Sequence, residues 1–207
     1  MALPAGVQTA AELMARTGAH LVFPVCAAVA GVFPLRGMER GRTYGVRGDA
    51  ASSLVFALIA EATRGGAWCA LVDMPHAGLR SAHEHGVALE RVVCIDAESS
   101  WPSVEGRVIG ALVEGFDIVV VRDPQWSPAD ARKVAARVKA QGAVLIVHGS
   151  ISGVPVDACL TARTQDWQFG ACATQRTVQV LAEGRRMPAG RTVTLLLPSS
   201  TGAAAVP

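Results

Sequence analysis

Five short apolar runs recur along the first three quarters of the chain, at 43–46, 68–72, 91–95, 117–121 and 143–147. Hydrophobic residues fill these runs without the alternation of a sheet that has one face in water. An uninterrupted run of this length is typical of a strand that helices cover on both faces. The pattern therefore predicts a mostly parallel sheet enclosed between two layers of helices.

The segments between these runs have the residues that begin and end helices. Ser127 and Pro128 stand where an N-cap and a first-turn proline are expected, and Gly142 follows the last turn. The segment 52–63 is apolar on all sides, which is typical of a buried helix. Two further helices are bracketed by a proline and a glycine, within 75–86 and 102–115.

Beyond residue 156 the pattern changes to three strand-like segments, 159–164, 176–182 and 191–197. Gly184 and Pro188 join the last two, so we expect an antiparallel extension at one edge of the parallel sheet. These observations predict the fold class: an α/β protein with a three-layer core, a mostly parallel sheet and an antiparallel C-terminal edge.

One domain is predicted over residues 1–198. Its N-terminal part, 1–41, contains a helix with a capping box at 9–17 and then an extended lead-in. The small or alanine-rich residues 199–207 are predicted to form a disordered tail. The uncharged stretch 17–35 is interrupted by prolines and a glycine, and its continuous apolar parts are too short to span a membrane. We therefore expect no membrane association.

Composition favours a cytoplasmic protein with a surface for a partner. The chain has five cysteines, an odd number with no C-x-x-C pair, which suits small buried hydrophobes in a reducing compartment. Charged residues make up 17% of the chain, below the usual ~25%, and a less polar surface favours contact with another protein. His76, His83 and His85 do not share one helix face, so no metal site is predicted.

The net charge of +2 and the dispersed basic residues argue against a dedicated nucleic-acid-binding protein, and we expect DNA contact to be weak at most. Candidate contacts with a partner or DNA are a modest basic cluster and three tryptophans in loop-like contexts. A tryptophan in such a place either anchors an interface or folds over a loop to cap the core. These candidates are Arg185, Arg186, Arg191, Trp101, Trp126 and Trp167.

The turn after the first predicted strand is where a sheet of this kind binds an anion, because helix N-terminal N–H groups point there. The segment 45–53 has glycines and serines like those of a phosphate loop, G-x-x-x-x-G-K-[ST]. The lysine is missing, and the first lysine of the chain is Lys133. We therefore predict a degenerate loop that binds no nucleotide cofactor. Its residues are Gly45, Gly48, Ala51 in the lysine position, Ser52 and Ser53.

From Gly45 to the segment 69–73, the spacing and residues resemble the core of RecA-type ATPases. In that family the second strand leads to an acidic general base, and Pro75 stands at that position here. A later strand leads to a magnesium-binding aspartate, which Arg122 replaces, and His148 matches the polar residue that senses the nucleotide. The resemblance therefore implies a RecA-like, P-loop-type fold without ATPase activity.

Within this superfamily the chain resembles the small, actinobacterial ImuA-prime type of ImuA accessory factor, from about residue 22 to residue 197. The segments that carry the resemblance are 35–41, 52–54, 66–72, 86–91 and 117–121. The resemblance implies a non-catalytic adaptor in SOS-induced DNA damage tolerance and mutagenic translesion synthesis. The implied partners are an ImuB-type inactive Y-family polymerase, an error-prone C-family DNA polymerase and RecA.

Two other functions stay open at this point. One is a nucleotide-binding or ATP-hydrolysing RecA-family enzyme with an atypical phosphate loop, although the missing lysine argues against it. The other is a cell-division inhibitor of the SulA type, which also resembles a degenerate RecA fold. Its target would be the tubulin-like division protein, so co-precipitation distinguishes it from the adaptor.

Overall fold

The computed structural model describes residues 21–207 except 76, 97–104, 171–172 and 186. The predicted helix at 9–17 and the candidate contact residues Trp101 and Arg186 lie outside the described residues.

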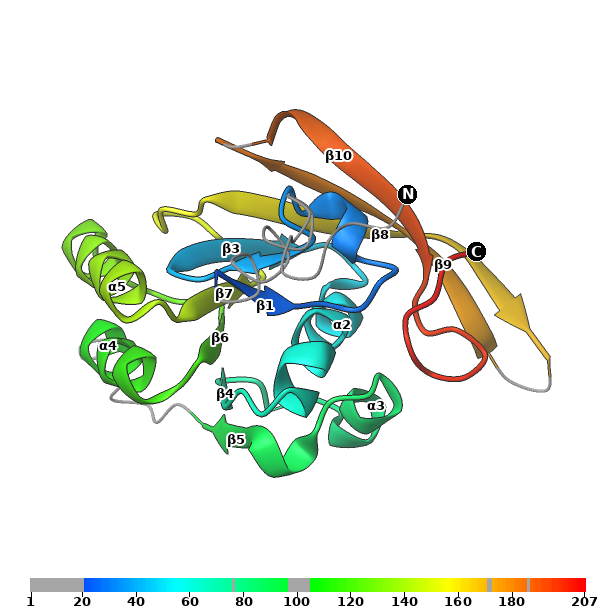
Figure 1. Cartoon of the computed structure of the whole chain (residues 1–207), viewed down its shortest axis with the longest axis horizontal. Coiled ribbons are helices and arrows are strands. Elements are labelled where there is room, and N and C mark those ends of the chain that lie inside the picture. The colour runs from blue at the N-terminus through cyan, green and yellow to red at the C-terminus, as the bar shows by residue number, and fades with distance from the viewer. Residues whose placement is uncertain (1–20, 76, 97–104, 171–172, 186) are drawn as a thin grey trace, which may run out of the picture.

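A mixed sheet of eight strands lies at the centre of the described structure (Figure 1). Its strand order is β10-β9-β8-β3-β7-β6-β4-β5. The strands from β8 to β5 run parallel, whereas β9 is antiparallel to both of its neighbours. The strands are β3 (Arg42–Arg47), β4 (Cys69–Val72), β5 (Val92–Ile95), β6 (Ile118–Arg122), β7 (Val144–His148), β8 (Ala158–Phe169), β9 (Ala173–Gly184) and β10 (Met187–Leu196).

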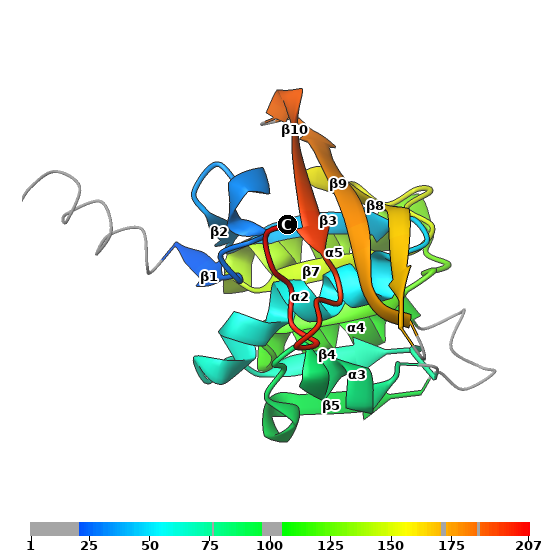
Figure 2. The same ribbon diagram turned by 90° about the vertical axis from the view of Figure 1, so that its right-hand side faces the viewer.

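Helices cover both faces of the parallel part of the sheet (Figure 2). On one face lie α2 (Ala51–Arg64) and α3 (Leu79–Glu84), and a short 3₁₀ turn, η2 (Leu89–Arg91), precedes β5. On the other face lie α4 (Glu105–Gly115) and α5 (Pro128–Gln141). The predicted fold class, a three-layer α/β core with an antiparallel C-terminal edge, is therefore confirmed.

Local sequence signals account for the ends of α5. The Ser127 hydroxyl accepts a hydrogen bond from the backbone N–H of Asp130 at 3.1 Å, and Pro128 follows the cap. Gly142 ends the helix in the left-handed conformation, with φ of 68°. Helix α2 has no such cap, because Ala50 stands at its N-cap without a side-chain hydrogen bond.

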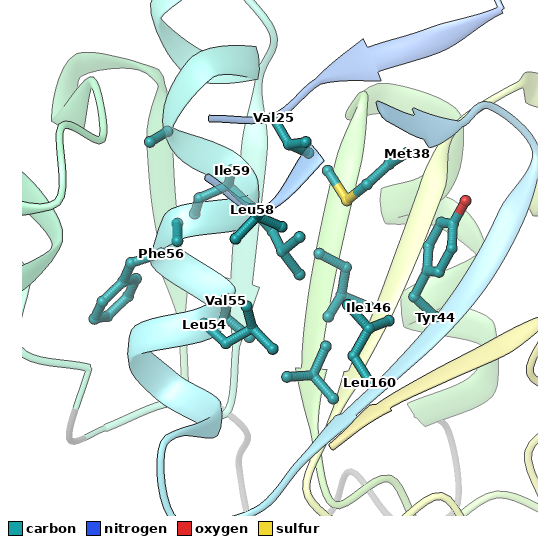
Figure 3. Close-up of a cluster of buried hydrophobic side chains, with 14 of the residues drawn as sticks. Val25, Met38, Tyr44, Leu54, Val55, Phe56, Leu58, Ile59, Ile146 and Leu160 are labelled. Atoms are coloured by element: carbon teal, nitrogen blue, oxygen red, sulfur yellow. The ribbon is translucent and has the colours of Figure 1, made fainter. Parts of the chain in front are cut away.

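The larger part of the core lies between α2 and the sheet. Figure 3 shows Leu54, Leu58 and Ile59 of this helix beside Ile146 of β7 and Leu160 of β8. All five side chains are fully buried. The apolar residues that predict a buried helix at 52–63 belong to α2, and they are buried because this helix packs on several strands at once.

The lead-in is more structured than an extended segment. Strands β1 (Val22–Pro24) and β2 (Gly37–Glu39) form a separate antiparallel pair, with the 3₁₀ turn η1 (Ala30–Val32) between them. Phe33 packs edge-on against Tyr44, with ring centroids 5.6 Å apart. Burial of these apolar side chains, which include Phe23 and Met38, attaches the lead-in to the core.

The residues 199–207, for which the sequence predicts a disordered tail, instead turn back along β10. Leu196 and Ala205 exchange two backbone hydrogen bonds of 2.9 and 3.0 Å. Ser199 is buried, and its N–H donates to the Ala203 carbonyl at 3.0 Å. These backbone hydrogen bonds hold a segment whose composition by itself does not favour a fixed conformation.

The structure also bears on two expectations from the sequence, that no segment spans a membrane and that the cysteines are buried. Among the described residues, no helix has the length and apolar character needed to cross a bilayer. Cys94 is exposed rather than buried, and β5, to which it belongs, is the last strand of the sheet among the residues that the structure describes.

Candidate functional site

The carboxyl ends of β3, β7 and β6 lie level with one another at one edge of the sheet. Val46 and Arg122 both pair with His148, so the residues after these strands share one surface. Ligands of parallel α/β sheets bind at this edge. The segment 45–53, for which the sequence predicts a degenerate phosphate loop, lies at this edge.

The connection between β3 and α2 consists of only three residues, 48–50. Gly45, which aligns with the first glycine of a phosphate loop, lies inside β3 and pairs with Val147 and Cys159. The Ile151 Cγ2 atom lies 2.8 Å from the position that a Cβ on Gly45 would take. A loop that holds a phosphate directs several successive N–H groups at one point. Only the three residues 48–50 are available for it between β3 and α2.

The turn is also attached to the neighbouring strand β8. Gly48 has φ of 105°, and a Cβ there would lie 2.0 Å from the Ala162 carbonyl oxygen. The Ala50 N–H donates to the same oxygen at 3.5 Å. The Asp49 carboxylate accepts from the Thr164 N–H at 3.1 and 3.3 Å, and hydrogen bonding by Thr164 holds the pKa of Asp49 below its usual value. Contacts with β8 thus occupy the turn.

The side chains of the first residues of α2 make contacts within the protein. Ala51, in the position of the missing lysine, is 4% exposed and belongs to the core. The Ser52 hydroxyl lies 3.1 Å from Nε2 of His148, so the positions that match the metal-binding serine and the sensor bond to each other. The Ser53 hydroxyl accepts from Nη2 of Arg176 at 2.8 Å. Internal partners therefore take both hydroxyls.

Arg176 of β9 is the residue at this edge that the sequence analysis missed. It is 8% exposed, its Nε donates to the Leu197 carbonyl at 2.8 Å, and its guanidinium lies 5.0 Å from the centre of the Trp167 ring. Burial lowers the pKa of the Arg176 guanidinium, and the nearby Asp49 carboxylate opposes this by favouring the charged form. The sequence contained a signal for this residue. Arg176 alternates in step with 178, 180 and 182, which places it on the inward face of β9.

The positions predicted to match the general base and the magnesium ligand of RecA-type ATPases, Pro75 and Arg122, hold no acidic residue. Pro75 lies exposed in the turn after β4. Arg122 ends β6, and its Nε lies 3.4 Å from Oδ2 of Asp123. Asp123 itself bonds to the next loop, because its Oδ1 accepts from the Ser150 N–H at 2.6 Å. Its carboxylate is thus paired on both sides.

The four predicted contact residues that the structure describes do not come together. Arg185 lines a cavity of about 270 Å³ with Arg42 and Lys139 at the opposite edge of the sheet. Arg191 donates to the Gly31 carbonyl at 3.5 Å. Trp126 is half-buried and packs on the core beside α4 and α5, so it caps the interior. Trp167 lies near the far end of the β8–β9 hairpin and is 39% exposed.

Two histidines make stability depend on pH. Burial lowers the pKa of His85, and it lowers the pKa of His148, which the charge of Arg122 reduces further. The unfolded chain then binds these protons more readily than the folded chain. The contribution of both imidazoles is therefore fully present above the pKa of unfolded histidine and is lost as the pH falls below it.

We expect the free energy of unfolding to decrease between about pH 7 and about pH 5, the range below the pKa of unfolded histidine. Denaturant titrations at both pH values measure the decrease. The variant His148→Gln, which keeps a polar group near Ser52, should show a smaller decrease. His83→Gln, at an exposed position of α3, serves as the control and should leave the decrease unchanged. An equal decrease in all three proteins contradicts the role of His148.

Comparisons with known proteins add a family and a fold. A family model described as the MT3502 N-terminal domain matches residues 31–153. No curated protein matches the chain in sequence. The crystal structure of the RadB recombinase is similar, with a TM-score of 0.64 and 15% identity, over 87% of this chain and 97% of that one. This likeness establishes a RecA-like fold for the chain.

Proposed function

This chain belongs to the family of the MT3502 N-terminal domain and has a RecA-like fold; on that premise we propose that it is an adaptor protein without ATPase activity. The observation that carries the proposal is the three-residue turn between β3 and α2. Its contacts with β8 argue against a loop that encloses phosphates. The buried Ala51 beside it puts the lysine position in the core rather than toward a ligand.

The missing acids support the same conclusion. Pro75 stands in the position of the general base, and Arg122 replaces the ligand of the metal ion. Loss of one preorganised charged group typically costs about 3–4 kcal/mol of transition-state stabilisation. The absence of lysine, base and metal ligand together leaves hydrolysis without its electrostatic support.

The process that the adaptor serves follows from the resemblance to ImuA-type factors. We assign it to SOS-induced DNA damage tolerance and mutagenic translesion synthesis in the cytoplasm. Its proposed main partner is an ImuB-type inactive Y-family polymerase, and the adaptor supports an error-prone C-family polymerase and contacts RecA. The neighbour RadB is described as a recombinase, and that description agrees with work on DNA.

Co-purification tests the proposal. The tagged chain is co-expressed with an ImuB-type protein and, separately, with the tubulin-like division protein. We expect a stable complex with the first protein that persists through gel filtration, and none with the second. A complex with the division protein alone would indicate a SulA-type inhibitor and contradict the adaptor.

A further inference from the structure

The outer end of the β8–β9 hairpin extends past the helices that cover the sheet (Figure 1). We call its described residues, 166–170 and 173–175, the hairpin tip. Nearly all of them are exposed, whereas the inner parts of both strands pack on the core. The tip thus adds nothing to the core and projects into solvent.

Two aromatic rings lie on the hairpin tip. Phe169 is 73% exposed and Trp167 is 39% exposed, with ring centroids 6.3 Å apart and planes inclined by 36°. Burial of apolar surface contributes about 25 cal/mol of stabilisation for each Å². A large apolar side chain that stays in water lacks this contribution. Adjacent exposed rings of this kind are typical of the residues that dominate binding in protein interfaces.

Several side-chain contacts connect the described residues of the hairpin tip with one another and with the body of the protein. Arg176 lies over the Trp167 ring and is itself fixed by its hydrogen bonds to Ser53 and Leu197. Further out, the Gln175 amide donates to the Gln168 side chain at 2.6 Å, and the Thr174 hydroxyl donates to the Gln168 carbonyl at 3.1 Å. A preorganised surface loses less conformational entropy on binding.

Charge decides which kind of partner fits. The stretch 165–175 has one formally charged residue, Asp166, and the next cation along β9 is the buried Arg176. Binding to a nucleic acid depends on cations that neutralise phosphates. The tip has no cation of its own within 165–175 to neutralise a phosphate backbone. It matches instead a folded protein with an apolar cleft and a basic rim.

We propose that the hairpin tip docks onto the adaptor's protein partner, with the rings of Trp167 and Phe169 in an apolar cleft and Asp166 against a basic group at its rim. This inference rests on the proposed adaptor function and adds the surface and the chemistry of the contact.

The test measures the dissociation constant of the complex between the full chain and an ImuB-type protein. We expect the double variant Trp167→Ala/Phe169→Ala to bind at least about a hundredfold more weakly, since each ring acts as a hot spot. Asp166→Lys should weaken binding about tenfold by reversing the charge at the rim. Gln179→Ala, exposed on the same hairpin but nearer the sheet, is the control and should bind like the unchanged chain.

Thermal melting of each variant checks the fold; a decrease of a few degrees is expected for the double variant, because Phe169 is mostly exposed but Trp167 packs against Arg176. Equal binding by the double variant and the unchanged chain overturns the inference while the adaptor function stands. An unchanged chain that forms no complex contradicts the adaptor function and the inference with it. Loss of single-stranded DNA binding or of self-association in the double variant, with partner binding intact, assigns the tip to another occupant and also overturns the inference.

Discussion

Replacement of Gly48 by alanine is expected to destabilise the fold by more than about 4 kcal/mol, enough to abolish soluble expression of a domain of ordinary stability. The added Cβ would lie 2.0 Å from the Ala162 carbonyl oxygen, which is backbone and cannot move aside. The φ of 105° adds strain that an L residue rarely tolerates. Relief of the clash would separate the turn from β8.

Gly66→Ala is the matched control for this prediction. Gly66 also has a positive φ, 96°, but nothing lies within 4 Å of the position of an added Cβ. Strain alone should cost about 1–2 kcal/mol. Denaturant titration of both variants, with soluble yield as a second readout, measures the difference. Equal stability of the two variants would mean that the contact between the turn and β8 is looser than described.

Arg176→Met is expected to lower the free energy of unfolding by about 3 kcal/mol, because a buried charge with several partners is removed and its partners stay behind. The Ser53 hydroxyl and the Leu197 carbonyl lose a charged donor, and the Trp167 ring loses its cation. For a chain of this length the midpoint of thermal unfolding should fall by about 6–12 °C.

Arg163→Ala is the control for Arg176, since Arg163 is an exposed arginine of the same hairpin. A surface substitution of this kind usually changes stability by less than about 0.5 kcal/mol. If both variants unfold at the same temperature, Arg176 does not join α2 to the hairpin in the way that its contacts indicate.

The elements of the parallel core were predictable because each is determined locally. The apolar run at 117–121 predicted a strand covered on both faces, and Ser127, Pro128 and Gly142 mark the ends of α5. The order of the tail was not predictable, since its hydrogen bonds to Leu196 join segments that the pattern treats separately.

The candidate site was predictable in part. Sequence alone shows that a lysine is missing at Ala51, and the structure adds that this side chain lies in the core. The turn is shorter than the gap between the predicted strand 43–46 and the predicted helix 52–63, because β3 continues to Arg47 and α2 begins at Ala51. The contact of Arg176 with Ser53 escaped prediction because 123 positions separate the two residues.

Nucleotide binding is the direct test of an adaptor without ATPase activity. The purified chain is titrated with Mg-ATP while its thermal stability and heat of binding are recorded, with a competent RecA-type ATPase as the positive control. We expect no stabilisation for the unchanged chain, and none for Ala51→Lys, because a lysine there cannot lengthen the turn at 48–50. Stabilisation of the unchanged chain by about 2.7 kcal/mol at a hundredfold excess over a dissociation constant would establish a working nucleotide site and contradict the account.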